Sequence, residues 1–340
     1  MTTRTGLIAA AVTGLATVLA ESQTRCGRAA DTTQAQAENA LLAGWDGVAH
    51  GYESASGHLS EVLSHLSDLE ERLTHAVEVL DRVHDDLSAP EVSGHLGAVI
   101  AELGEEHLDN AALAADKALR HLETVEAGWL VGVAQDLARD LQESGEALMT
   151  IRDDLAEEIG AADALGPTDT EMTPRVEELR RQGHGPQRHG PQVTDQQLTD
   201  RVLWWIDPMT GTTVDGDTGG QHRCAKVATK VASEASYVAA EAFIRSSRAF
   251  DQARRQAEAG HESMMKVVVP LPDIYGPGYR ERIRGVQRNG SRTHPTGDPA
   301  GTRPPTEVDF TDGRMIAVYT RRPGGKFRLK TMFPDPRGAV

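Results

Sequence analysis

Apolar residues recur every seven positions between Tyr52 and Pro90. The first register is Leu59, Leu66, Leu73, Leu80 and Leu87, and the second, three positions later, is Val62, Leu69, Ala76 and Val83. A pattern sustained over this many heptads is typical of a long helix with a continuous apolar face. Such a face has to be covered, so we expect a helical partner for this heptad segment.

The rest of the first 160 residues shows apolar positions at helical spacing as well. We expect further helices at about residues 6–43, 95–127 and 129–160. Two interpretations of residues 1–20 stay open. The segment from Gly6 to Ala20 fits the apolar core of a cleaved signal peptide, and its apolar residues also fit one face of a structural helix.

Alternating residues near the C-terminal end predict a β-hairpin. Arg314 to Thr320 alternates, Pro323 to Gly325 supplies a turn, and Phe327 to Phe333 alternates again. The residues expected on one face of the last strand are Phe327, Leu329, Thr331 and Phe333, and those expected on the other are Arg328, Lys330 and Met332. Short apolar runs at Met264 to Val269 and at Ile283 to Val286 predict further strands.

The region between these two parts has a different composition. Residues 161–195 contain a Gly-Pro pair and the near-repeat HGPQRHGPQ, and such polar and turn-forming residues predict a flexible linker. Residues 222–258 carry an apolar stripe at helical spacing. Ser233 is a candidate N-cap for a helix that begins there instead.

We therefore expect a multidomain chain. Residues 1–160 form an acidic all-α domain of long, coiled-coil-like helices, residues 161–195 form the linker, and residues 196–340 form a basic α+β domain with a small antiparallel sheet. A chain of 340 residues has room for two such cores.

The charge distribution supports this division. The net charge of −16 is unevenly distributed. Residues 1–165 hold 9 basic and 30 acidic residues, residues 166–219 hold 5 and 9, and residues 220–340 hold 21 and 12. A basic domain with a net charge of +9 indicates a polyanionic partner such as nucleic acid, although contact with the acidic half remains an alternative. The cations chosen as substrate-binding candidates are Arg245, Lys326, Arg328 and Lys330.

Several classes of protein are disfavoured by missing motifs. The sequence has no P-loop, GxSxG, HExxH or GxGxxG motif in the required context, and we expect no cofactor and no metal site. Its two cysteines, Cys26 and Cys224, do not form a disulfide framework. No run of 18 apolar residues is present, so we expect no membrane span.

Two short segments of the basic domain resemble a known family. Ser233 to Glu241 (SEASYVAAE) and Leu329 to Pro334 (LKTMFP) are similar to segments of the RNase A-like toxin domains found in bacterial polymorphic and contact-dependent inhibition toxins. In that family the last strand supplies a Thr and, two residues later, a Tyr. Here Thr331 matches the Thr, and Phe333 replaces the Tyr.

The same family has a His followed by an Arg ahead of the helix that starts with Ser. His222 and Arg223 lie in that region, and His294, in the loop sequence SRTHP, is the second candidate histidine. The resemblance implies a ribonuclease that uses the internal 2′-OH as nucleophile without a metal, with RNA, tRNA being one candidate, as substrate. The catalytic set expected from it is His222, Arg223, Thr331, Phe333 and His294.

The resemblance also implies a biological setting. Trp45-Asp46-Gly47 between two expected helices is similar to the W-x-G turn of small helical-hairpin proteins exported by type VII-like systems of actinobacteria. A secreted toxin that acts in a target-cell cytoplasm and is neutralised by a cognate, acidic immunity protein is the resulting expectation. The alternative is a basic domain that binds nucleic acid or a partner without catalysis, carried on a helical export or interaction protein.

Overall fold

The computed structural model describes residues 2–84, 87–165, 169–289 and 303–336. It divides the chain into two compact units. The first consists of Met1–Asp85 and Val99–Glu158, and the second of Asp86–Ala98 and Ile159–Val340. The first unit is all-helical and the second contains small antiparallel sheets, which confirms the expected fold class.

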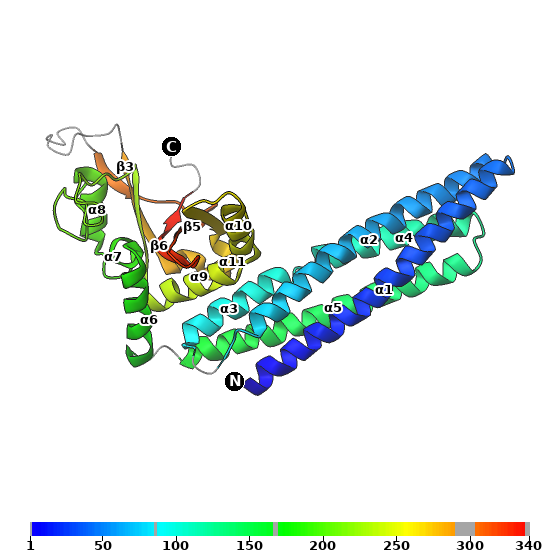
Figure 1. Cartoon of the computed structure of the whole chain (residues 1–340), viewed down its shortest axis with the longest axis horizontal. Coiled ribbons are helices and arrows are strands. Elements are labelled where there is room, and N and C mark those ends of the chain that lie inside the picture. The colour runs from blue at the N-terminus through cyan, green and yellow to red at the C-terminus, as the bar shows by residue number, and fades with distance from the viewer. Residues whose placement is uncertain (1, 85–86, 166–168, 290–302, 337–340) are drawn as a thin grey trace. The chain divides into compact units, whose positions relative to one another are not determined.

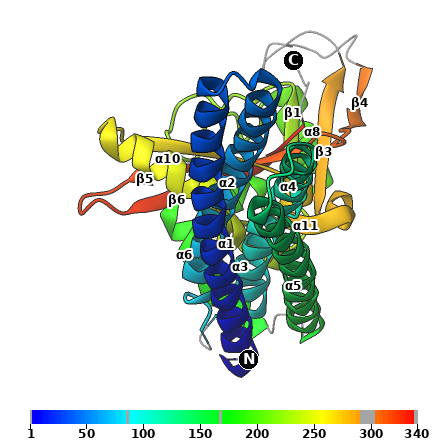
Figure 2. The same ribbon diagram turned by 90° about the vertical axis from the view of Figure 1, so that its right-hand side faces the viewer.

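The first unit is built from long helices (Figure 1). They are α1 (Thr2–Leu42), α2 (Asp46–Leu80), α4 (Glu106–Thr124) and the larger part of α5 (Trp129–Leu165). α2 packs against α1 on one side and α4 on another, and Figure 2 shows α1 and α2 alongside each other from a second direction. The heptad residues Leu59, Leu66 and Leu73 are fully buried in this packing. The chain's own helices therefore cover the heptad face.

Two helix boundaries differ from those expected. α2 ends at Leu80, and Pro90 lies in the first turn of a separate helix, α3 (Ala89–Glu102), where a missing amide hydrogen costs nothing. The single helix expected at 95–127 is interrupted around Gly104, so α3 and α4 are distinct. Glycine weakens a helix interior, and Gly104 lies in the short break between the two helices.

α1 is the one described helix that is long and apolar enough to cross a membrane. Its apolar residues at positions Ile8, Val12, Leu15 and Leu19 are at most 5% exposed, because they pack inside the first unit. A core helix and a signal sequence both meet the criteria of length and hydropathy, so the absence of a membrane span stays a prediction.

The second unit contains two three-stranded antiparallel sheets. One has the order β1 (Val227–Val231), β3 (Ile283–Asn289) and β4 (Arg303–Glu307). The other has the order β2 (Met264–Pro270), β5 (Arg314–Arg321) and β6 (Phe327–Asp335). β1 and β6 are edge strands of different sheets, yet they are in contact, and the hydroxyl of Thr229 donates to the carbonyl of Pro334 at 2.6 Å.

Helices pack on these sheets around a large hydrophobic cluster that includes Tyr237, Phe243 and Tyr319 and a smaller one that includes Val193, Leu198 and Val202. α9 (Glu234–Ser246) and α10 (Arg248–Ala259) are followed in the sequence by β2, α11 (Leu271–Tyr275) and the 3₁₀ helix η1 (Gly276–Arg282). Ser233 caps α9 by accepting from the amide of Ser236, as expected. The longer helix expected from residue 222 is wrong for residues 227–231, where the β-branched sequence VATKV forms β1 instead.

The segment expected to be a flexible linker is largely folded, so that prediction is wrong. It contains α6 (Asp169–Gln182) and α7 (Gly185–His189), and it leads into α8 (Asp195–Trp204). Pro186, Arg188 and His189 are buried. The polar composition was misleading because Arg188 forms ion pairs with Asp207 and Asp215. These carboxylates replace water around its guanidinium group, so the side chain can be buried.

The last hairpin forms as expected, but its alternation is broken. Val318 pairs with Thr331 while the next residue, Tyr319, pairs with Leu329, so Lys330 is an extra residue in β6. This β-bulge shifts the pattern of burial. Leu329 is buried before the bulge and Met332 after it, and Thr331 is turned out of the face that it was expected to share with Leu329.

Acidification should weaken the packing of α2 against α4. Burial, with the charges of Arg72 and His65, lowers the pKa of His107, and Asp68 opposes this only in part. A histidine whose pKa is lower in the folded chain binds its proton more tightly in the unfolded chain, so acid favours unfolding. The free energy of unfolding should therefore fall as the pH drops below about 6.5.

Urea unfolding followed by circular dichroism tests this between pH 8 and pH 5. His107→Gln should match the wild type at pH 8 and lose less stability at pH 5. His50→Gln, at an exposed position on the same helix pair, is the control and should follow the wild type throughout. Parallel curves for His107→Gln and the wild type would contradict the assignment.

Candidate active site

A pocket of about 290 Å³ opens where the edge strands β1 and β6 meet α7 and α8. The polar and aromatic residues that line it are His184, His189, Arg201, Arg223, Lys226, Thr229, Thr331, Phe333 and Asp335. The carboxylate of Asp335 is paired with Arg314 at 2.8 Å, so its charge is compensated. The pocket thus brings together three of the five expected catalytic residues, Arg223, Thr331 and Phe333. The histidines that line it come from the segment expected to be a linker.

Two glycines allow His184 to approach β6. A Cβ atom on Gly183 would lie 2.1 Å from the carbonyl oxygen of Lys330, and one on Gly185 would lie 2.4 Å from the hydroxyl of Tyr237. Any side chain at either position would collide with the strand or the core beneath it. The Gly-His-Gly sequence therefore places His184 directly beside the bulge that precedes Thr331.

His189 ends α7 and is 7% exposed. Its Nδ1 lies 2.8 Å from the carbonyl oxygen of Thr229, so Nδ1 carries the hydrogen and donates it, which leaves the lone pair on Nε2. Its ring stacks on Phe333 with 5.0 Å between the ring centroids. Burial, followed by the charge of Arg201, lowers the pKa of His189 well below its usual value, so the ring is neutral at neutral pH.

Arg201 is a buried cation without an acidic partner. It projects from α8 with 9% exposure, its Nη1 donates to the carbonyl of Arg188, and its Nε has no hydrogen-bond partner in the described part of the chain. No carboxylate of a described residue forms an ion pair with it. Burial lowers its pKa, but a guanidinium remains protonated at neutral pH. A buried charge of this kind favours an anionic ligand.

Hydrogen-bond donors complete the anion-binding character of the pocket. The hydroxyl of Thr331 is buried and has no partner among the described residues. Arg223 is exposed and Lys226 is half-buried, so both lie where a bound anion meets solvent. Phe333 contributes a ring face and no hydroxyl.

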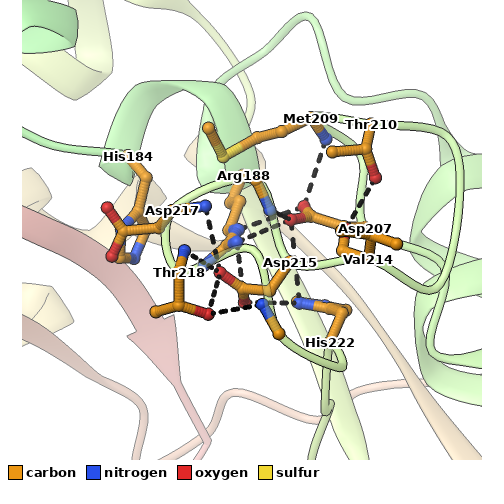
Figure 3. Close-up of polar contacts among 12 residues, drawn as sticks. His184, Arg188, Asp207, Met209, Thr210, Val214, Asp215, Asp217, Thr218 and His222 are labelled. Carbon is orange, nitrogen blue, oxygen red and sulfur yellow. Dashed lines mark hydrogen bonds and ion pairs between the residues drawn. The ribbon is translucent and has the colours of Figure 1, made fainter.

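His222, the first choice from the sequence, belongs to a different cluster (Figure 3). Arg188 forms a two-pronged ion pair with Asp207, at 3.0 and 2.5 Å, and its Nη2 also lies 2.9 Å from Asp215. His222 places Nδ1 3.1 Å from Asp215 and is 2% exposed. It does not line the pocket, so the pocket lacks the histidine expected first from the sequence.

The same cluster holds three groups of the kind that ligate metals. Asp207, Asp215 and His222 offer ligand atoms within 4.8 Å of one another. Burial would raise the pKa of Asp207, but hydrogen bonds from Arg188 and from the amides of Gly216 and Met209 hold it below its usual range. The guanidinium of Arg188 already occupies the position that a cation would take, so these residues fit a structural ion cluster better than a metal centre.

None of the four expected substrate-binding cations lines the pocket, although Lys330 lies close to it. Arg245 is paired with the fully buried Glu241 and stacks over Tyr319, which makes it part of the core. Lys326 and Arg328 are exposed at the turn end of the β5–β6 hairpin and do not line the pocket. Lys330 has its Nζ 4.0 Å from Asp217, next to His184.

The remaining candidate, His294, lies outside the described residues. No family model, curated protein or solved structure matches this chain.

The folded character of the pocket-forming segment has one signal in the sequence. Thr194 and Gln197 form a capping box, in which the Thr194 hydroxyl accepts from the amide of Gln197 and the Gln197 side chain accepts from the amide of Thr194. The pattern of Thr, two residues and Gln before Leu198 and Val202 predicts a helix start at this position. That start places Arg201 on a helix face beside Val202.

Phosphate should bind at Arg201 and stabilise the fold. Because Arg201 is buried and unpaired, Arg201→Met should leave the free protein unchanged or stabilise it by about 1–4 kcal/mol, the range for replacing buried charged groups by apolar ones. It should also abolish the stabilisation of the wild type by phosphate, which is seen as a rise in the thermal midpoint. At a hundredfold excess of phosphate over Kd this stabilisation is about 2.7 kcal/mol.

Differential scanning fluorimetry across a phosphate titration makes this measurement. Lys326→Met removes an exposed cation outside the pocket and should keep the full response. An undiminished phosphate effect in Arg201→Met would overturn the anion site.

Removing one carboxylate from the ion cluster should be costly. Asp207→Asn removes one of the two carboxylates that pair with the buried guanidinium of Arg188. The free energy of unfolding should fall by about 3–5 kcal/mol at neutral pH. The pKa of Asp207 is held low, so this stabilisation is present at neutral pH and is lost as the pH falls. Urea unfolding should therefore show the two proteins converging in acid, and a constant difference would contradict this account.

Proposed function

We propose that the second unit is a metal-independent ribonuclease that cleaves RNA through attack of the 2′-OH on the adjacent phosphate. The observation that supports this most is the pocket in which His189, the unpaired Arg201 and the unpaired hydroxyl of Thr331 converge. Transesterification of RNA needs a base at the 2′-OH and cations or donors around the pentacoordinate phosphorus, and these residues offer both.

His189 is the general base in this proposal. The hydrogen bond from its Nδ1 to the carbonyl of Thr229 leaves Nε2 as a lone pair that can accept the proton of the 2′-OH. Burial makes His189 a weak base while the pocket is empty. A phosphodiester bound next to the ring favours the imidazolium form and raises the pKa of His189. Stacking on Phe333 holds the ring plane during this proton transfer.

Arg201 and Thr331 bind the phosphate. The guanidinium supplies charge in a buried position, where it is screened little by water, and the hydroxyl of Thr331 donates a hydrogen bond. Arg223 and Lys226 at the rim lie where neighbouring phosphates of the strand would pass. Binding should therefore weaken as salt increases.

The family resemblance also fits better with these residues than with those first chosen. It calls for a His followed at some distance by an Arg, both ahead of the helix that starts with Ser233. His189 and Arg201 satisfy that order and separation, whereas His222 and Arg223 are adjacent. Thr331 keeps its assigned role, and Phe333 acts through its ring.

We extend the proposal to the biological role. The resemblance to polymorphic and contact-dependent inhibition toxins makes this unit the toxic part of an exported chain, with an acidic immunity protein as its partner. Induced expression of the full chain in bacterial cytoplasm should then degrade RNA and stop growth. His189→Ala should relieve both effects, and growth arrest that persists in this variant would count against the proposal.

Cleavage of a labelled RNA under single-turnover conditions tests the mechanism. The full chain should cut in EDTA, leave a 2′,3′-cyclic phosphate, and spare a linkage whose 2′-OH is replaced by hydrogen. His189→Ala should lower the rate by roughly 10²–10⁴, the usual scale for loss of a general base. Thr331→Val should cost about tenfold, which corresponds to ~1.4 kcal/mol.

His261→Asn is the matched control. This histidine is exposed, does not line the pocket and has a positive φ of 54° that Asn tolerates, so cleavage should stay at the wild-type rate. Binding of RNA without any cleavage would favour the alternative of a non-catalytic nucleic-acid-binding domain. Cleavage that stops in EDTA would exclude the metal-free mechanism.

A further inference from the structure

The proposed reaction also needs a proton donor. When the 2′-oxygen attacks phosphorus, the bond from phosphorus to the 5′-oxygen breaks, and that oxygen must be protonated as it leaves. The base cannot supply this proton in the same step, because it is receiving one. Phe333 has no hydroxyl to donate, and burial raises the pKa of Cys224, the thiol that lines the pocket.

His184 is the second histidine that lines the pocket. Its Nδ1 lies 3.1 Å from Oδ2 of Asp217, and Figure 3 shows the two side chains next to each other. This is an ion-pair distance without hydrogen-bond geometry, since Nδ1 of His184 has no hydrogen-bond partner among the described residues. A carboxylate beside Nδ1 favours the imidazolium form, and Nε2 is the ring nitrogen that remains to serve the pocket.

The position of Asp217 is itself well determined. Its amide donates to Oδ1 of Asp215 at 3.0 Å, and Asp215 is paired with Arg188. Gly183 and Gly185 fix the other partner, since their close contacts with β6 and Tyr237 leave the backbone around His184 little freedom. The His184–Asp217 pair is thus held from both sides.

We infer that His184, oriented by Asp217, is the general acid of this site. The inference rests on the proposed ribonuclease function. In the cleavage step the 2′-OH gives its proton to Nε2 of His189, its oxygen bonds to phosphorus, and the 5′-oxygen leaves with the proton from Nε2 of His184. Charge and atoms balance, and the products are a 2′,3′-cyclic phosphate and a free 5′-OH.

The surrounding charges suit an acid of moderate strength. Burial and the nearby cations Arg188 and Lys330 lower the pKa of His184 more than Asp217 raises it, so the imidazolium form depends on a phosphodiester bound in the pocket. His189 lies close enough for each ring's charge to disfavour charge on the other. One proton shared between the two rings, on His184 before cleavage and on His189 after it, is the arrangement that this coupling favours.

A substrate whose leaving group needs no proton tests the acid directly. The comparison uses a dinucleotide with an ordinary 5′-oxygen leaving group and a uridine 3′-phosphate ester of p-nitrophenol, whose anion leaves unaided. His184→Ala should slow cleavage of the dinucleotide by roughly 10²–10⁴ and slow the nitrophenyl ester less than tenfold. His189→Ala should slow both substrates strongly, because both need a base.

The pH profile tests the role of Asp217 as a positioning residue. Asp217 favours the protonated form of His184, so Asp217→Asn should move the alkaline limb of the rate profile to lower pH. A merely structural role would lower the rate equally at every pH. Asp312→Asn, an exposed carboxylate away from the pocket lining, is the matched control and should leave the profile unchanged.

The outcomes separate this inference from the proposed function. If the wild type cleaves neither substrate, the ribonuclease proposal fails. If the wild type cleaves both and His184→Ala slows the two substrates equally, or slows neither, the ribonuclease stands and His184 is not its acid. An alkaline limb unmoved by Asp217→Asn would likewise remove Asp217 from the mechanism.

Discussion

The geometry of the candidate site depends on the buried ion pair between Arg188 and Asp207. The guanidinium holds one carboxylate with two bonds and a second, that of Asp215, with another. α7 is only five residues long and could not keep a fixed position by its own backbone bonds. Since His189 is the next residue after Arg188, the ion pair indirectly sets the position of its ring.

Close backbone packing supplies the second constraint. The bulge at Lys330 changes which residues of β6 turn toward the core, and this frees Thr331 for the pocket. The glycines on either side of His184 then allow the chain to lie on the bulged strand. The bulged strand β6 and the chain around His184 are therefore complementary in shape. The close backbone packing positions His184 more than the contacts of its own side chain do.

Local patterns in the sequence predicted the regular parts of this fold well. The heptad leucines from Leu59 to Leu80, the two strands of the last hairpin and the Ser233 cap are each decided within a few residues, and each forms as expected. The segment 184–195 could not be assigned in this way. Its polar composition is stabilised by Asp207 and by contacts with β1 and β6, all distant in the sequence, so no local pattern reveals that it is buried.

The same reasoning explains why Thr331 and Phe333, two of the expected catalytic residues, line the pocket and His222 does not. Thr331 and Phe333 lie on a strand whose position in the sheet follows from alternation, even though the bulge changes their face. A catalytic histidine, in contrast, is defined by what its two ring nitrogens contact. His222 and His189 are both buried, and the contacts of their ring nitrogens distinguish them. Nδ1 of His222 is held by a carboxylate, whereas Nδ1 of His189 donates to a backbone carbonyl beside the pocket.

Two buried arginines have opposite roles in this unit, and the difference lies in where the carboxylates are. Asp207 and Asp215 both pair with Arg188, so that arginine is neutralised and structural. Arg201 donates to the carbonyl oxygen of Arg188 and forms no ion pair with a carboxylate of the described residues. If a carboxylate of the cluster turned to Arg201, the pocket would lose its attraction for phosphate and α7 would lose its anchor. Because Asp207 and Asp215 both pair with Arg188, Arg201 remains available for an anionic ligand.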